Sequence, residues 1–114
     1  MAESRSHVNQ IYIDPAVREY IVDLIRATRF PAKIDAGLKH LIRSGASPRG
    51  TINLALTARA RAFSAGRAFV TPQDVKDMVH DVLRHRILLS YEAEAEEVTT
   101  DQILDRVLAK VPVP

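Results

Sequence analysis

Arg49 is the residue whose type and position most directly suggest chemistry. It follows Ser47 and Pro48, which fit the cap and the first position of a helix, so Arg49 is predicted at the second helical position. A helix start exposes unsatisfied N–H groups and a positive dipole end, and an arginine there costs roughly a few tenths of a kcal/mol. Such a placement makes sense where an anion lies nearby. Spacing alone leaves an ordinary exposed arginine as the alternative.

Two glycines just before and after Arg49 have the spacing of a phosphate-binding P-loop. That motif also needs a preceding strand, and a lysine followed by Ser or Thr directly after the second glycine. Here Thr51 and Ile52 follow Gly50, and no clear strand precedes Gly45. The chain therefore lacks a complete P-loop.

The other candidate groups do not converge. His80 and His85 are five residues apart, about 140° around a helix, so they would not share one metal ion. His7 and His40 lack partners at a suitable spacing, and Ser47 has no neighbouring His or Lys to activate it. We predict no metal site and no catalysis by this chain alone. The clustered carboxylates are predicted to lie in a solvated loop: Glu92, Glu94, Glu96 and Glu97.

Length and composition limit the class of protein. A chain of 114 residues that is 46% hydrophobic and 26% charged suits one globular domain with its own core. No apolar run approaches the ~18 residues of a membrane span, so we expect neither a span nor a signal peptide. The absence of cysteine excludes disulfides and favours a reducing compartment, so we expect a cytoplasmic location.

Charge is distributed unevenly along the chain. Residues 1–67 hold eleven Lys and Arg against five Asp and Glu, a net charge of +6, whereas residues 68–114 carry a net −4. Twelve of the sixteen cations are arginine, which suits bidentate contact with phosphate or carboxylate. A genome that generally favours Arg over Lys would give the same excess of arginine.

Caps and apolar periodicity predict four main helices. They are expected over residues 15–30, 48–65, 72–86 and 100–111, each starting beside a capping residue, and three with a first-turn proline. Thr99 with Gln102 fits a capping box, and Gly66 fits a left-handed helix stop. The second helix carries one apolar stripe, and the small residues that flank it are expected to let another helix approach closely. The stripe comprises Ile52, Leu56, Ala60 and Phe63, and the flanking residues are Ala55, Ala58, Ala62 and Ala65.

The connecting segments are less regular. Ile11–Ile13 and Phe69–Val70 are short β-favouring pieces, and 33–44 is expected to connect two helices with one or two helical turns. Ile87–Leu89 could be a strand or a buried helix end. The predicted fold class is therefore all-α, a small bundle of about four main helices, with a short strand pair left open. Residues 1–10 are expected to be a flexible N-terminal segment, and 11–114 the folded domain.

Several motifs occurring in one order resemble the C-terminal lid of MoxR-type AAA+ ATPases. They are GASPR at 45–49, VTPQDVK at 70–76, VLRHRI at 82–87 and the terminal VPVP, with YIVDLIRATR at 20–29 before them. The resemblance runs from about Ile11 to Pro114 and implies an AAA+ helical lid domain over 11–114. One departure is Gly50, where alanine is more usual in the family. Glycine there weakens the helix start by up to ~1 kcal/mol.

The resemblance carries expectations about function. It implies that Arg49 is the sensor 2 residue, which approaches the γ-phosphate of ATP in the full-length context. ATP and Mg²⁺ would be bound mainly by an ATPase core that this chain lacks, and the isolated chain would bind no cofactor. The partners would be that upstream core and neighbouring subunits of a ring homo-oligomer that hydrolyses ATP and acts as a chaperone, with no membrane and no nucleic acid.

The residues also support two other hypotheses about function. A small helical nucleic-acid-binding module is suggested by the +6 first half and by three arginines on the long helix and just after it, Arg59, Arg61 and Arg67. A protein-interaction adaptor is suggested by the acidic run at 92–97. The adaptor reading is compatible with a lid.

Overall fold

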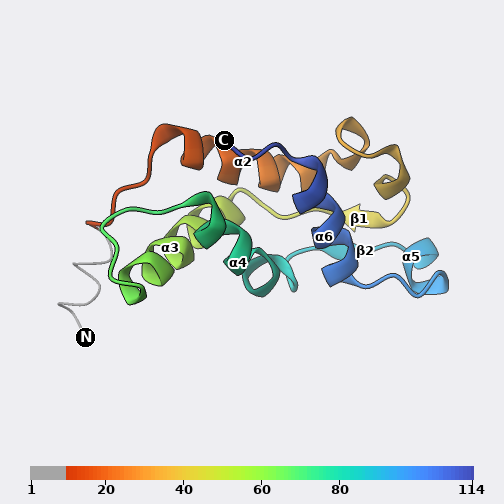
Figure 1. Cartoon of the computed structure of the whole chain (residues 1–114). Helices are drawn as coiled ribbons and strands as arrows, with labels where there is room; N and C mark the ends of the chain where they lie inside the picture. The colour runs from red at the N-terminus through yellow and green to blue at the C-terminus, as the bar shows by residue number, and fades with distance from the viewer. Residues whose placement is uncertain (1–9) are drawn as a thin grey trace.

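The computed structural model describes residues 10–114; the segment expected to be flexible, 1–10, therefore lies outside the described residues except for Gln10. Four longer helices and one short helix make up most of the fold (Figure 1). The helices are α2 (Pro15–Arg29), α3 (Arg49–Ser64), α4 (Pro72–Leu83), α5 (Tyr91–Ala95) and α6 (Thr100–Lys110). The predicted all-α bundle is confirmed.

Three of the longer helices begin where the caps predicted. The Asp14 side chain accepts from the Ala16 N–H at 2.8 Å at the start of α2. Reciprocal capping boxes begin α4 at Thr71 and α6 at Thr99. Such boxes satisfy two orphan N–H groups at once, so these helix starts are defined locally.

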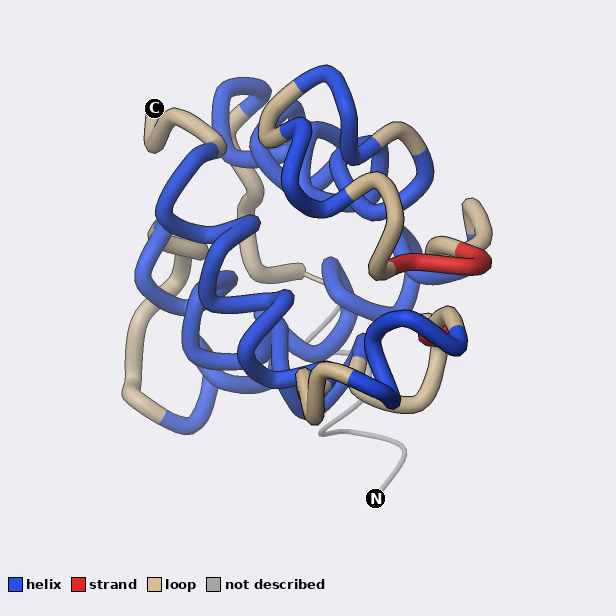
Figure 2. Tube along the Cα trace, turned by 90° about the vertical axis from the view of Figure 1, so that its right-hand side faces the viewer, coloured by secondary structure: helices blue, strands red, loops and turns tan. Residues whose placement is uncertain are grey.

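The segment between α2 and α3 contains two single 3₁₀ turns, η1 (Pro31–Lys33) and η2 (Ala36–Leu38), and then strand β1 (Ile42–Ser44). β1 pairs antiparallel with β2 (Leu88–Leu89), and Ile42 lies opposite Leu89. The apolar run at 87–89 is thus an edge strand rather than a helix end. Figure 2 shows both strands at one side of the helical bundle.

The core lies between α2, α3, α4 and α6. α3 and α4 pack most extensively, because Ala58 and Ala62 on α3 are fully buried and let the helices approach closely. α2 contributes Tyr20, Ile21 and Leu24, all buried. The short β-favouring pieces meet in one parallel bridge, in which the Tyr12 N–H donates to the Ala68 carbonyl at 3.0 Å.

The acidic run differs in part from the sequence prediction. Glu92 and Glu94 lie in α5, which the Ser90 hydroxyl caps by accepting from the Ala93 N–H at 3.1 Å. Glu96 and Glu97 lie in the turn that follows, and all four carboxylates are exposed. On α3 the apolar stripe is exposed, and two of the alanines that flank it are buried where α4 packs closely, as predicted. Leu54, Ala58 and Ala62 form the buried face instead, and Ile52 is 67% exposed.

Candidate functional site

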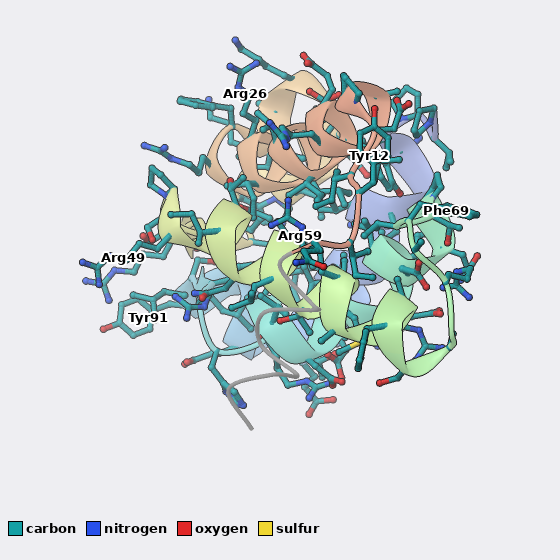
Figure 3. All side chains as sticks on the ribbon, turned by 90° about the vertical axis from the view of Figure 1, so that its left-hand side faces the viewer. Tyr12, Arg26, Arg49, Arg59, Phe69 and Tyr91 are labelled. Carbon is teal, nitrogen blue, oxygen red and sulfur yellow. The ribbon has the colours of Figure 1, made fainter. Side chains whose placement is uncertain are left out.

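Arg49 is the first residue of α3, one position earlier than predicted, and its side chain is exposed. Ser47 does not cap the helix with its side chain; the helix start has no side-chain cap. Instead the Gly50 and Thr51 N–H groups donate to the carbonyls of Ser47 and Pro48, at 2.8 and 3.1 Å. In Figure 3 Arg49 extends away from the ribbon into solvent. The Arg49 side chain forms neither a hydrogen bond nor an ion pair with any of residues 10–114.

The loop before Arg49 is anchored to the end of α2. The hydroxyl of fully buried Thr28 donates to the Ile25 carbonyl at 2.7 Å and accepts from the Ala46 N–H at 3.1 Å. Gly45 lies so close that a Cβ there would overlap the Thr28 carbonyl and stand 2.7 Å from the Arg29 Cα. These contacts fix the position at which α3 begins, and therefore the position of the Arg49 backbone.

Gly50 has a reason in the tertiary structure. It is buried, and a Cβ at this position would lie 3.1 Å from Ile25 Cδ1 and 3.4 Å from Leu83 Cδ2. Glycine lowers the stability of the helix start by up to ~1 kcal/mol. In return, its missing side chain allows close contact with α2 and α4. The N–H groups of this turn keep their hydrogen bonds, so Gly50 leaves the helix start intact.

The surroundings of the α3 start are positively charged. A hollow of about 420 Å³ next to it is lined by Arg29, Arg43 and the 44–48 segment. Arg29 lies 5.9 Å from the centre of the Phe30 ring. In the described part of the chain, no carboxylate lies within ion-pair distance of Arg29, Arg43 or Arg49. A helix start with exposed guanidinium groups and no acid is suited to hold a phosphate oxygen.

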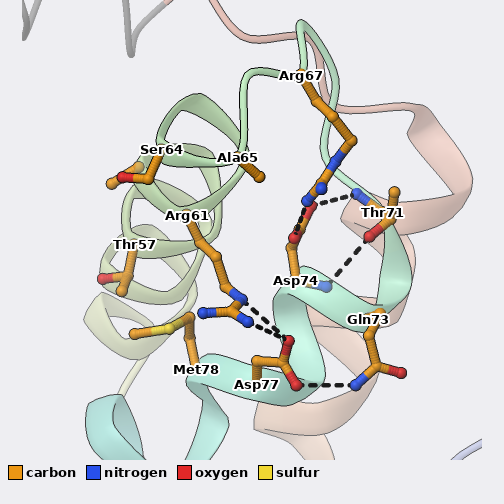
Figure 4. A pocket seen from close by; sticks show the side chains of 11 residues that line it. Thr57, Arg61, Ser64, Ala65, Arg67, Thr71, Gln73, Asp74, Asp77 and Met78 are labelled. Atoms are coloured by element: carbon orange, nitrogen blue, oxygen red, sulfur yellow. Dashed lines mark hydrogen bonds and ion pairs between the residues drawn. The ribbon is translucent and has the colours of Figure 1, made fainter.

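The larger hollow between α3 and α4, about 700 Å³, is different (Figure 4). Its charges pair within the protein: Arg61 Nε donates to Asp77 at 2.9 Å, and Arg67 forms an ion pair with Asp74. Burial raises the pKa of Asp74, but hydrogen bonds from the Thr71 N–H and the Arg67 guanidinium outweigh burial and lower that pKa overall. The Arg61–Asp77 pair joins α3 to α4, whereas the Arg67–Asp74 pair joins the segment after α3 to the first turn of α4.

Ion pairs engage much of the charge that suggested other functions. Arg61 and Arg67 pair with aspartates, and Arg59 Nε donates to the Ile11 carbonyl at 3.2 Å. The three arginines that suggested nucleic-acid binding are therefore each paired with another group of the domain. In the acidic run, Glu96 lies 3.4 Å from His40 Nε2.

The histidines among residues 10–114 occupy interhelical or surface positions, and His7 lies outside the described residues. His80 Nε2 lies 2.7 Å from Asp105 on α6, and His85 follows the end of α4. Across residues 10–114, no three His, Cys, Asp or Glu side chains are grouped as a metal site requires. No helix of this described region has the length and apolar content that crossing a bilayer demands.

What sequence reasoning missed here are the residues that support Arg49. In the sequence, Thr28 fits an apolar helix stripe, and Gly45 fits an ordinary loop position. Arg29 and Arg43 flank the site but lie 20 and 6 residues before Arg49 in the sequence, on other elements. Only the packing of α2 against the 45–46 segment brings these residues together.

Comparison with known proteins gives consistent matches. The AAA lid domain family matches residues 36–107. The chain is 38% identical over 104 residues to "Chaperone MoxR1" of Mycobacterium tuberculosis, covering 90% of this chain and 28% of that protein. It is 41% identical over 110 residues to "Protein MoxR" of Paracoccus denitrificans, with 90% and 32% covered.

A solved structure shares the fold. The crystal structure of a protein from Cytophaga hutchinsonii, described as a candidate ATPase, superposes with a TM-score of 0.93 at 42% identity. The match covers 96% of this chain and 33% of that one. The chain thus spans about a third of the length of these relatives.

Proposed function

Since the chain belongs to the AAA lid domain family and is the C-terminal lid of a MoxR-type AAA+ ATPase, we propose that Arg49 is its sensor 2 residue. In this proposal Arg49 contacts the γ-phosphate of an ATP molecule held by an ATPase core, its own or a neighbour's. The observation that carries the proposal is an exposed guanidinium with no carboxylate partner among residues 10–114, at a helix start without a side-chain cap.

The residues present fit a phosphate group. ATP, with Mg²⁺ bound by the core, supplies the phosphoryl group that is transferred. Arg49 would donate hydrogen bonds to γ-phosphate oxygens, and Arg29 and Arg43 would add positive potential nearby. A guanidinium fixed on a helix can meet the charge that develops on those oxygens in the transition state without reorganising. Among the described residues, no three His, Cys, Asp or Glu side chains are grouped so that they could hold Mg²⁺.

The proposal includes the assembly. The full-length protein would be a ring-forming ATPase with a chaperone function, as the name of the Mycobacterium relative suggests. The lid alone would not hydrolyse ATP, and its partners would be the core and neighbouring subunits. The lack of cysteine supports a cytoplasmic location.

Substitution of Arg49 tests the proposal. In the full-length ATPase that carries this lid, Arg49→Ala is expected to lower kcat by about 100-fold or more, the typical effect of removing one transition-state contact. The free energy of unfolding should change by less than about 0.5 kcal/mol, because the side chain is exposed. Arg86→Ala, another exposed arginine without an ion pair among the described residues, is the matched control. An unchanged kcat in Arg49→Ala would refute the sensor role.

A further inference from the structure

An apolar hollow of about 330 Å³ lies between the last turns of α2, the η1 turn and the segment after α6. One face of α2 lines it with Asp23, Arg26 and Ala27, because residues three and four apart lie on the same side of a helix. The remaining lining residues are Phe30, Lys33, Ile34, Val111 and Pro112. Phe30 is 53% exposed although its side chain is large and apolar. We refer to this hollow as the α2 hollow.

The charged groups of the α2 hollow have no ion-pair partners among residues 10–114. Neither Arg26 nor Lys33 has a carboxylate within ion-pair distance in this part of the chain, and Asp23 has no cation. Lys33 Nζ lies 5.5 Å from the centre of the Phe30 ring. The hollow therefore offers an aromatic surface, two cations for carboxylates and one carboxylate that can accept a hydrogen bond.

Helix α5 presents the complementary groups on the same chain. Tyr91 is 82% exposed, and its side chain points outward in Figure 3. At 100° per residue, Tyr91 lies about 160° from the buried Ala93, with Glu92 on one side of it and Glu94 on the other. Neither glutamate forms an ion pair with another described residue. We refer to Tyr91, Glu92 and Glu94 as the α5 knob.

We propose that the α5 knob of one copy of this chain binds in the α2 hollow of a second copy. The Tyr91 ring packs against Phe30, and the Tyr91 hydroxyl donates to the Asp23 carboxylate. The two glutamates of the knob pair with the two cations of the hollow. The ring contact supplies most of the buried apolar area, and the opposite charges fix the orientation of the knob.

The occupant is a second copy because the chain itself carries both halves of the contact. Tyr91 does not fill the hollow of its own chain, since most of its side chain is exposed. Each copy can give its knob to one neighbour and receive the knob of another, and such head-to-tail contacts form a ring when the rotation between copies closes. One knob buries less area than the ~1,600 Å² of a typical stable interface, so the contact adds to an assembly that other parts of the protein hold together. It does not depend on the role of Arg49.

The test is cysteine cross-linking between copies of the full-length ATPase that carries this lid, with its other cysteines replaced by serine. One preparation carries Ala95→Cys, four residues after Tyr91 on the same side of α5, and the other carries Ala32→Cys, beside Lys33. The two are mixed before assembly and treated with a short bis-maleimide. Ala65→Cys, at the residue after α3, replaces Ala95→Cys in the matched control, and all three alanines are exposed.

We expect Ala95→Cys to cross-link to Ala32→Cys at least ten-fold more than the control does. Adding Tyr91→Ala should lower this yield about ten-fold, the effect of removing a buried aromatic anchor. Tyr12→Ala, which removes a tyrosine that is 58% exposed outside the knob, should leave the yield unchanged.

Charge reversal distinguishes a direct contact from misfolding. Glu92→Lys/Glu94→Lys in one preparation, or Arg26→Glu/Lys33→Glu in the other, should lower the cross-linking yield about ten-fold. Mixing the two reversed preparations should restore at least half of it, which damaged folding would not do.

Equal cross-linking by Ala95→Cys and Ala65→Cys, or no recovery with both charges reversed, would overturn the proposal. Sedimentation of the same samples separates this contact from the proposed assembly. A ring without the specific cross-link overturns the knob contact alone, whereas a monomer overturns the ring as well. An α2 hollow that is covered by a different protein gives the first of these results.

Discussion

The starts of α3 and α4 look alike in sequence and differ in structure. Each has a hydroxyl residue followed by proline, Ser47-Pro48 and Thr71-Pro72. At α4 the Thr71 N–H donates to Asp74 at 2.9 Å, the Thr71 hydroxyl accepts from the Asp74 N–H at 3.2 Å, and Arg67 pairs with the same carboxylate. At α3 there is no side-chain cap and no acid in the first turn, and Arg49 is exposed.

The difference shows how one kind of helix start can serve stability or binding. At α4 the positive helix end is neutralised by Asp74, whose side chain is buried, so that end has no capacity left for an anion. At α3 the positive end remains open, and Gly45 and Thr28 anchor it from behind. The open end costs local stability and leaves a place for a phosphate.

Gly45→Ala should have the largest effect, because it breaks the anchor that the α3 start has in place of a cap. The new Cβ would overlap backbone atoms of Thr28 and Arg29, which cannot move aside. We expect a loss of about 3 kcal/mol in the free energy of unfolding, measured by urea titration. Gly37→Ala is the control, since its Cβ would meet the flexible Arg106 side chain. Equal effects of the two substitutions would show that the anchor is unimportant.

Asp74→Asn removes the charge that closes the α4 start and should cost about 2 kcal/mol at pH 7. Because the folded pKa of Asp74 is below 3.8, its stabilisation is present above that value and is lost as pH falls from about 3.8 through the lower folded pKa. The difference between wild type and Asp74→Asn should therefore shrink at pH 3.

Urea titrations at pH 7 and pH 3 measure this. Asp77→Asn breaks a more exposed ion pair with Arg61 and should cost under about 1 kcal/mol at pH 7. A difference between wild type and Asp74→Asn that stays constant down to pH 3 would contradict the lowered pKa.

Ser47→Asp sharpens the comparison by giving α3 an acid at its start, as α4 has. A negative charge beside the positive helix end should stabilise the lid by about 0.3–1 kcal/mol. In the full-length ATPase the same carboxylate should compete with phosphate for Arg49, so turnover is expected to fall about ten-fold. Ser64→Asp, at the other end of α3, is the control. A more stable lid with unchanged turnover would argue against a phosphate at this helix start.

Much of the fold could be predicted because its signals are local. Asp14, Thr71 and Thr99 each sit within a few residues of the N–H group they accept from, and all three caps are confirmed. Pairing of Ile42 with Leu89 joins residues 47 positions apart, so periodicity could only leave a strand pair open. α5 was missed because a five-residue helix has too few residues for a periodic pattern.

In the candidate site, too, local sequence patterns predict some features, and tertiary packing decides the others. The placement of Arg49 near a helix start follows from Pro48 alone. The buried face of α3 follows only in part, because Ala58 and Ala62 are buried as their small size predicted, whereas no pattern distinguished buried Leu54 from exposed Ile52 and Leu56. The contact of Gly45 with Thr28 depends on how α2 crosses the 45–46 segment, which no local pattern records.

The Thr28 hydrogen bond and the close approach of Gly45 have a mechanical consequence. They join the last turn of α2 to the residues just before Arg49 with no slack between them. α2 is about 22 Å long, so its stiff last turn and the start of α3 move together. Tilting the lid as one body would swing Arg49 through an arc, and the angle of α2 would set how far Arg49 stands from a phosphate.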